Sequence, residues 1–94
     1  MSILFFIAFA HTNKALTCAA YSYIDIADDQ ECRHAVIYAT TINSNAKYKG
    51  SGSWEYNPKG CYMYDNGYLY FNSHSTGSYK SITQNICKKG NCMY

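Results

Sequence analysis

Residues 60–72 read Gly-Cys-Tyr-Met-Tyr-Asp-Asn-Gly-Tyr-Leu-Tyr-Phe-Asn, and this stretch predicts a β-hairpin. Two aromatic-rich runs flank Asp-Asn-Gly, a combination typical of tight turns. A two-residue loop would mix apolar side chains and tyrosines on both faces, whereas a three-residue loop, residues 65–67, separates them. The longer loop also places Gly67 at the left-handed position that it requires. In this register the cross-strand pairs are Tyr64 with Tyr68, Met63 with Leu69, Tyr62 with Tyr70 and Cys61 with Phe71.

The two faces of this hairpin differ in chemistry. One face has the apolar character of a core and carries Cys61, Met63, Leu69 and Phe71. The other, called the tyrosine face below, carries Tyr62, Tyr64, Tyr68 and Tyr70. Tyrosine combines a large ring with a polar tip, which suits a binding surface. We expect this face, with Trp54 and Asn72, to bind a glycan or an extracellular protein; the alternative is that Tyr21, Tyr23 and loops cover it.

Size and charge set limits on the function. A chain of 94 residues is expected to form one domain, whose core benefits from covalent cross-links. The net charge is +2 and charged residues make up 15% of the chain, unlike the strongly basic composition of nucleic-acid-binding proteins. We therefore expect no nucleic-acid partner.

The N-terminus contains a continuous apolar run, Ile3 to Ala10. This run is too short for a membrane-spanning helix, which takes about 20 residues, and it is typical of a secretory signal peptide. Cleavage is expected after Ala10 or after Ala15. The prediction is a signal peptide over residues 1–15 and a single secreted domain over residues 16–94, with no membrane span. The alternative is a buried N-terminal strand.

Five cysteines follow this run: Cys18, Cys32, Cys61, Cys87 and Cys92. In a short secreted chain such a density predicts a disulfide framework. The preferred pairing joins Cys32 to Cys61 and Cys18 to Cys87, which leaves Cys92 free or in an intermolecular bond. A rival pairing joins Cys87 to Cys92, and spacing does not decide between them.

Metal binding is the less favoured use of these residues. Cys32 and His34, or Cys87 and Cys92, have ligand chemistry, but the paired C-x2–4-C knuckles of zinc sites are absent from the sequence. We expect no metal and no cofactor.

The rest of the chain predicts one helix and a few strands. Asp28 is a helix cap, and apolar residues recur at helical spacing from Cys32, so a helix is expected from Asp29 to about Ala39. We expect short strands at 54–56 and 82–87, an extended segment before residue 27, a turn at 57–60 and loops over 40–53 and 73–78. The predicted fold class is α+β: one helix packed on a small antiparallel sheet of three to four strands.

The order of these motifs resembles a known module. Glu31-Cys32-x-x-Ala35, Asn57-Pro58-x-Gly60-Cys61-Tyr62, Leu69-Tyr70-Phe71-Asn72 and Ile86-Cys87-Lys88 follow one another. This arrangement resembles a small cysteine-rich module of predicted extracellular proteins from marine protists and algae. The resemblance covers Cys18 to Lys88 and implies an extracellular domain, without implying a reaction.

Catalytic motifs are not evident. The acids cluster around the predicted helix start, Glu55 is the only strand acid, and the cysteines are better used in bridges. We therefore expect a non-catalytic recognition module. The alternative is a self-associating structural subunit of an extracellular assembly, linked through Cys92.

Overall fold

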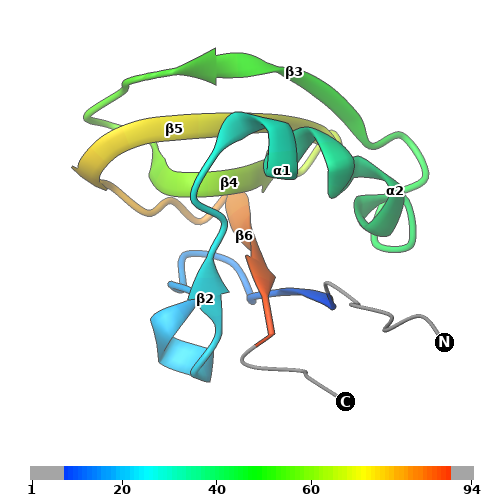
Figure 1. Ribbon diagram of the computed structural model, residues 1–94, viewed down its shortest axis with the longest axis horizontal. Coiled ribbons are helices and arrows are strands. Elements are labelled where there is room, and N and C mark those ends of the chain that lie inside the picture. Colours follow the sequence, from blue (N-terminus) through cyan, green and yellow to red (C-terminus); the bar gives the residue numbers. More distant parts are fainter. Residues whose placement is uncertain (1–7, 90–94) are drawn as a thin grey trace, which may run out of the picture.

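Six strands form one mixed sheet, and two short helical segments cover one of its faces (Figure 1). The computed structural model describes residues 8–89. In chain order the elements are β1 (Phe9–His11), the 3-10 helix η1 (Ala19–Tyr21), β2 (Ile24–Asp25), α1 (Asp29–His34), α2 (Val36–Ala39), β3 (Lys47–Gly52), β4 (Pro58–Tyr64), β5 (Tyr68–Gly77) and β6 (Thr83–Lys88).

The strand order is β1-β6-β4-β5-β3, and β2 also pairs with β6. All pairs are antiparallel except β3 with β5, which is parallel. The α+β class is confirmed, but the predicted sheet of three to four antiparallel strands was too small. Of the additional strands, β1 begins inside the apolar run that was assigned to the signal peptide, β2 has only two residues, and β3 is an edge strand with a Gly- and Ser-rich sequence.

The hairpin between β4 and β5 has the predicted register. Cys61 pairs with Phe71, Tyr62 with Tyr70 and Met63 with Leu69. The amide of Gly67 donates to the carbonyl of Tyr64 over 2.9 Å, and Gly67 has φ +97°, as the three-residue loop requires. The predicted core face is buried in a cluster with the helix and β6.

The predicted helix is present over residues 29–39, divided at Ala35 into α1 and α2. Asp28 caps its start, because the side chain of Asp28 accepts a 2.7 Å hydrogen bond from the amide of Glu31. Cys32, Ala35 and Ala39 are fully buried, so the small side chains let the helix approach the sheet closely.

Several predicted loops are strands. Residues 47–52 form β3, residues 73–77 prolong β5, and residues 58–60 belong to β4. The predicted strand over residues 54–56 is absent, because residues 55–56 form a turn. The segment before residue 27 is only partly extended, because residues 19–21 form η1. Backbone pairing with β5 stabilises β3, and Tyr48 is its one large side chain that packs against the core, so the Gly- and Ser-rich composition was misleading.

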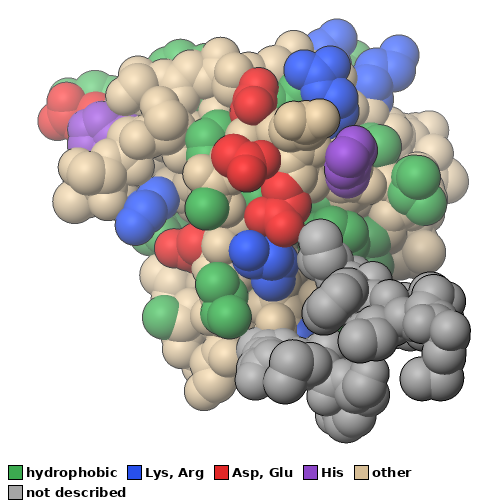
Figure 2. Space-filling view, viewed as in Figure 1, with side chains coloured by type: hydrophobic (Ala, Val, Ile, Leu, Met, Phe, Trp, Pro, Cys, Tyr) green, Lys and Arg blue, Asp and Glu red, His purple; other side chains and the backbone are tan. Residues whose placement is uncertain are grey.

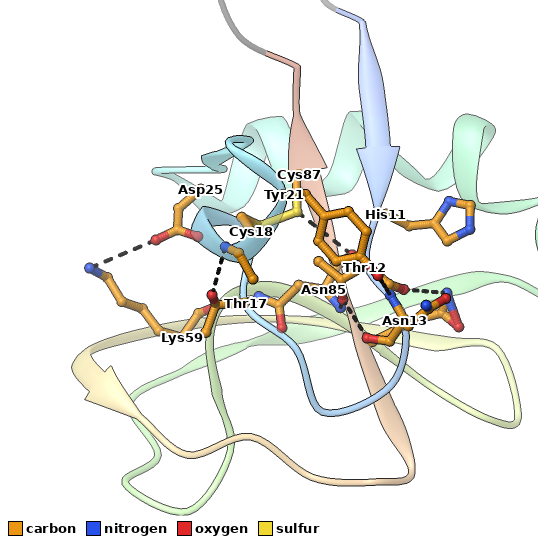
Figure 3. The surroundings of a disulfide bond; sticks show 12 residues. His11, Thr12, Asn13, Thr17, Cys18, Tyr21, Asp25, Lys59, Asn85 and Cys87 are labelled. Carbon is orange, nitrogen blue, oxygen red and sulfur yellow. Dashed lines mark hydrogen bonds and ion pairs between the residues drawn. A yellow bond between two sulfur atoms is a disulfide. The ribbon is translucent and has the colours of Figure 1, made fainter.

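Two disulfides fasten opposite sides of the sheet. Cys32–Cys61 joins α1 to β4. Cys18–Cys87, shown in Figure 3, joins the N-terminal segment to β6. The preferred pairing is therefore confirmed and the rival Cys87–Cys92 pairing was wrong. Cys92 lies outside the described residues, as does the predicted signal peptide up to residue 7. Two disulfides indicate that the chain folds in an oxidising environment.

Candidate functional site

The two faces of the sheet can be followed through its register. Tyr62 lies opposite Asn85 and Tyr64 opposite Thr83, so these four side chains share the face turned away from the helices. Acidic side chains gather on the helix-bearing side of the molecule (Figure 2), where Asp29 and Glu31 occupy the first turn of α1. The tyrosine face is thus separate from this acidic side.

An open pocket of about 390 Å³ lies on the tyrosine face. Its walls come from β4, from the start of β5, from the β4–β5 turn and from the loop between β3 and β4. The lining residues are Trp54, Asn57, Tyr62, Tyr64, Asn66, Tyr68 and Tyr70.

The aromatic rings stand at different angles around Tyr70. The ring of Tyr62 stacks on it at 5.8 Å and 25°. The rings of Trp54 and Tyr64 meet it edge-on, at 5.9 Å and 90° and at 5.8 Å and 89°. The pocket is therefore bounded by rings that face different directions, instead of by one flat aromatic surface.

The rings also differ in exposure. Tyr62 is 1% exposed and forms the base, whereas Tyr68 is 37% exposed and stands at the rim. Burial, the charges of Tyr64 and Tyr70 and a hydrogen bond with Tyr64 raise the pKa of Tyr62 well above its usual range. Tyr62 therefore stays protonated, as a neutral surface and not a base.

Trp54 is held in place by Asn72 and Gly52. The Nδ2 of Asn72 lies 2.7 Å from the carbonyl oxygen of Trp54, and the Oδ1 of Asn72 accepts a 2.8 Å hydrogen bond from the Trp54 amide. The indole rests against Gly52, where an added methyl group would collide with the ring. These contacts fix the loop that carries Trp54 at the pocket wall.

Polar groups border the pocket at Asn57. Its Oδ1 accepts hydrogen bonds from the Tyr64 hydroxyl, at 3.2 Å, and from the Lys80 ammonium, at 2.8 Å. At the turn, the Oδ1 of Asn66 accepts from the Tyr68 amide at 3.0 Å, which leaves the Nδ2 of that side chain as a further donor beside the rings.

The structure brings five of the six predicted binding residues together: Trp54, Tyr62, Tyr64, Tyr68 and Tyr70. Asn72 is different, because it is 1% exposed and hydrogen-bonded to backbone behind the pocket. Tyr21 and Tyr23, the alternative cover of this face, stack on each other and do not line the pocket.

Sequence reasoning missed Asn57, Asn66 and Lys80. The sequence explains Asn57 and Asn66 as turn residues, so it gives no reason to expect their side-chain amides at the pocket. Lys80 had no signal at all, since it lies between β5 and β6 and approaches the pocket only through the fold.

Comparisons with protein-family models, with curated proteins and with solved structures found no match. They therefore support no family assignment, and the resemblance to the module of marine protists and algae stays a prediction. What the structure establishes is a small α+β domain with two disulfides.

Two further features of residues 8–89 concern metal ions and membranes. This part of the chain contains no group of three or more His, Cys, Asp or Glu side chains placed to hold a metal ion. Within the same range, none of the helices is both long and apolar enough to cross a membrane.

Proposed function

We propose that this chain is a non-catalytic, secreted recognition module that binds a glycan in the aromatic pocket. The observation that carries the proposal is the convergence of five aromatic rings and two asparagine amides on one open hollow. Aromatic rings pack against the apolar faces of sugar rings, and amides supply directional hydrogen bonds to hydroxyl groups.

The dimensions of the pocket favour a compact ligand. Its volume of about 390 Å³ falls within the ~300–1,000 Å³ of small-ligand sites. A protein partner would instead need roughly 800 Å² of contact surface on each side. A short stretch of sugar residues therefore suits the pocket better than a flat protein surface does.

The lining also favours binding over catalysis. The described residues that line the pocket are one tryptophan, four tyrosines and two asparagines. This set offers no carboxylate pair and no nucleophile with a neighbouring base. The two disulfides support secretion, because they persist in oxidising compartments.

Trp54 provides the test, because it is the only tryptophan in the chain and stands in the pocket wall. A glycan array, followed by fluorescence titration of Trp54 with the glycans that bind, should give saturable changes. Tyr68→Ala should weaken binding at least tenfold without unfolding the domain. Tyr56→Ala is the matched control, since Tyr56 is 72% exposed and does not line the pocket. Absence of binding across the array, or equal losses in both variants, would contradict the proposal.

A second candidate is the assembly subunit linked through Cys92. It is favoured by one observation: the four cysteines of the described residues pair with one another. If Cys92 forms an interchain bond, non-reducing electrophoresis should show a dimer that reductant and Cys92→Ser both abolish. A monomer under non-reducing conditions would rule out this linkage.

A further inference from the structure

Lys80 places a positive charge at the edge of the aromatic pocket. Its ammonium lies 2.8 Å from the Oδ1 of Asn57, which lines the pocket, and the hydroxyl of Tyr64 binds the same oxygen. The backbone of Lys80 is also fixed, because its carbonyl accepts hydrogen bonds from the amide and hydroxyl of Thr83. The ammonium is therefore held beside the pocket from a defined position.

The charge of Lys80 has no carboxylate partner among residues 8–89. The three ion pairs of this part of the chain are Lys14 with Asp65, Lys59 with Asp25 and Lys88 with Glu31. Lys80 is half-buried like Lys59 and Lys88, but it meets only a neutral amide oxygen. An ammonium whose hydrogen-bond partner is a neutral amide oxygen retains its charge for an anion.

A second lysine stands on the other side of the pocket. The ammonium of Lys49 lies 4.7 Å from the centre of the Tyr68 ring. Of the nearby acids, Asp65 in the β4–β5 turn is paired with Lys14 in a chain that keeps this residue, and Glu55 is exposed to solvent in the loop that carries Trp54. An aromatic cage for a quaternary ammonium ligand is therefore an unsuitable interpretation, because the lysines on both sides of the pocket would repel a positively charged ligand.

We propose that the ligand is an acidic glycan, whose carboxylate or sulfate group contacts the Lys80 ammonium while its sugar rings lie against the tyrosines and Trp54. This inference rests on the proposed glycan-binding function and specifies the charge of the ligand. The side-chain nitrogen of Asn57 belongs to the amide that meets the ammonium, and it can contribute a further hydrogen bond to the anion.

The experiment is a matched array of tetrasaccharides with differently linked hexose backbones. Each backbone is presented in three forms: neutral, oxidised to the uronate, and 6-O-sulfated. At low ionic strength, the native chain should bind the acidic form of its preferred backbone at least tenfold more tightly than the neutral form. The uronate and sulfate forms show which anion Lys80 accepts.

The variants separate charge recognition from a structural role of Lys80. Lys80→Gln should reduce the preference for the acidic form to about twofold or less, keep binding of the neutral form and leave the melting temperature unchanged. Lys80→Arg should retain the preference. Lys89→Gln is the control, because it removes the same charge from an exposed residue beyond the end of β6.

Two failures are distinguishable. If no tetrasaccharide binds in any form, the proposed function is wrong. If neutral and acidic forms bind equally, or if Lys80→Gln keeps the preference, glycan binding stands and the assignment of an acidic ligand is wrong.

Discussion

Asn72 shows how one buried amide determines the shape of the pocket. Its Nδ2 lies within hydrogen-bonding distance of the carbonyl oxygens of Trp54, Asn57 and Pro58, at 2.7, 3.0 and 2.9 Å. Its Oδ1 accepts from the amides of Trp54 and His74 at 2.8 and 3.1 Å. The side chain adds to the backbone hydrogen bonds of the loop over residues 54–57, in which the Asn57 amide donates to the Trp54 carbonyl and the Ser78 amide to the Asn57 carbonyl. Asn72 therefore acts on the pocket by positioning Trp54.

Removing this amide should destabilise the domain. In Asn72→Ala the Trp54 amide loses its acceptor and the carbonyls of residues 54, 57 and 58 each lose a donor, which should cost about 3 kcal/mol of unfolding free energy. Asn72→Asp should also be destabilising, because a carboxylate would face three carbonyl oxygens. Urea denaturation measures both effects, with the exposed Asn45→Ala as control. A fully stable Asn72→Ala protein that no longer binds glycan would instead make Asn72 a direct ligand contact.

Tyr62 should make the stability of the domain depend on alkaline pH. Burial, first of all, raises its pKa in the folded chain. The unfolded chain releases this proton near pH 10, the ordinary pKa of tyrosine, whereas the folded chain retains it. The stabilising contribution is therefore complete below about pH 10 and is lost as the pH rises further towards the folded pKa.

The measurement is the unfolding free energy between about pH 9 and 11, a range that includes the ordinary tyrosine pKa. The free energy should fall with rising pH, and Tyr62→Phe should make that fall shallower. Tyr56→Phe, at a 72% exposed position, should not change it. Identical slopes in all three proteins would show that Tyr62 ionises alike in both states.

At the scale of elements, the β4–β5 hairpin depends on Gly67 for two reasons. Its φ of +97° disfavours any other residue, and a Cβ atom there would lie 3.0 Å from the backbone of Asn45. We expect Gly67→Ala to lower the unfolding free energy by about 2 kcal/mol, of which the left-handed backbone alone accounts for ~1–2 kcal/mol.

Gly50→Ala separates these two reasons. Gly50 also has a positive φ, +148°, but a Cβ atom there would meet nothing within 4 Å. Denaturation should therefore show a smaller loss for Gly50→Ala than for Gly67→Ala. Equal losses would mean that the approach of Asn45 to the turn contributes nothing.

The hairpin was predictable because its turn chemistry and its face chemistry require the same register. β3 was not, because its pairing with β5 depends on backbone groups and leaves little trace in the side chains of residues 47–52. The same distinction applies to the site. Alternation along β4 and β5 predicted the four tyrosines and even the side of the sheet on which Asn72 lies. It did not predict that the loop over residues 54–57 would cover Asn72, or that Lys80 would reach Asn57.

At the scale of the whole molecule, the disulfides secure two layers on either side of one sheet. Cys32–Cys61 spans 29 residues and ties the helix to β4, whereas Cys18–Cys87 spans 69 residues and ties the N-terminal segment to the opposite face. By the loop-closure entropy that they remove from the unfolded chain, bridges of these lengths stabilise the fold by about 3.6 and 4.4 kcal/mol. The longer bridge makes the N-terminal segment part of the domain.

Residues 9–15 belong to this N-terminal layer. β1 pairs with β6, and Thr12, which is fully buried, exchanges hydrogen bonds with Asn85: its amide donates at 3.0 Å and its Oγ1 accepts at 3.1 Å. The amide of Ala15 donates to the carbonyl of Thr83 at 3.1 Å. The two cleavage positions expected from the sequence therefore have different structural consequences, because a cut after Ala10 keeps the Thr12 and Ala15 contacts and a cut after Ala15 removes them.

We expect a chain that starts at His11 to be more stable than one that starts at Leu16. The shorter chain loses the Thr12 and Ala15 hydrogen bonds and the Lys14–Asp65 ion pair, and it leaves buried groups of Asn85 without partners. At 0.5–1.5 kcal/mol for each hydrogen bond and more for each orphaned group, the difference should be about 3–5 kcal/mol. Urea denaturation of both chains, expressed with intact disulfides, measures it. Equal stabilities would mean that β6 is satisfied without residues 11–15, and that the domain tolerates either cleavage position.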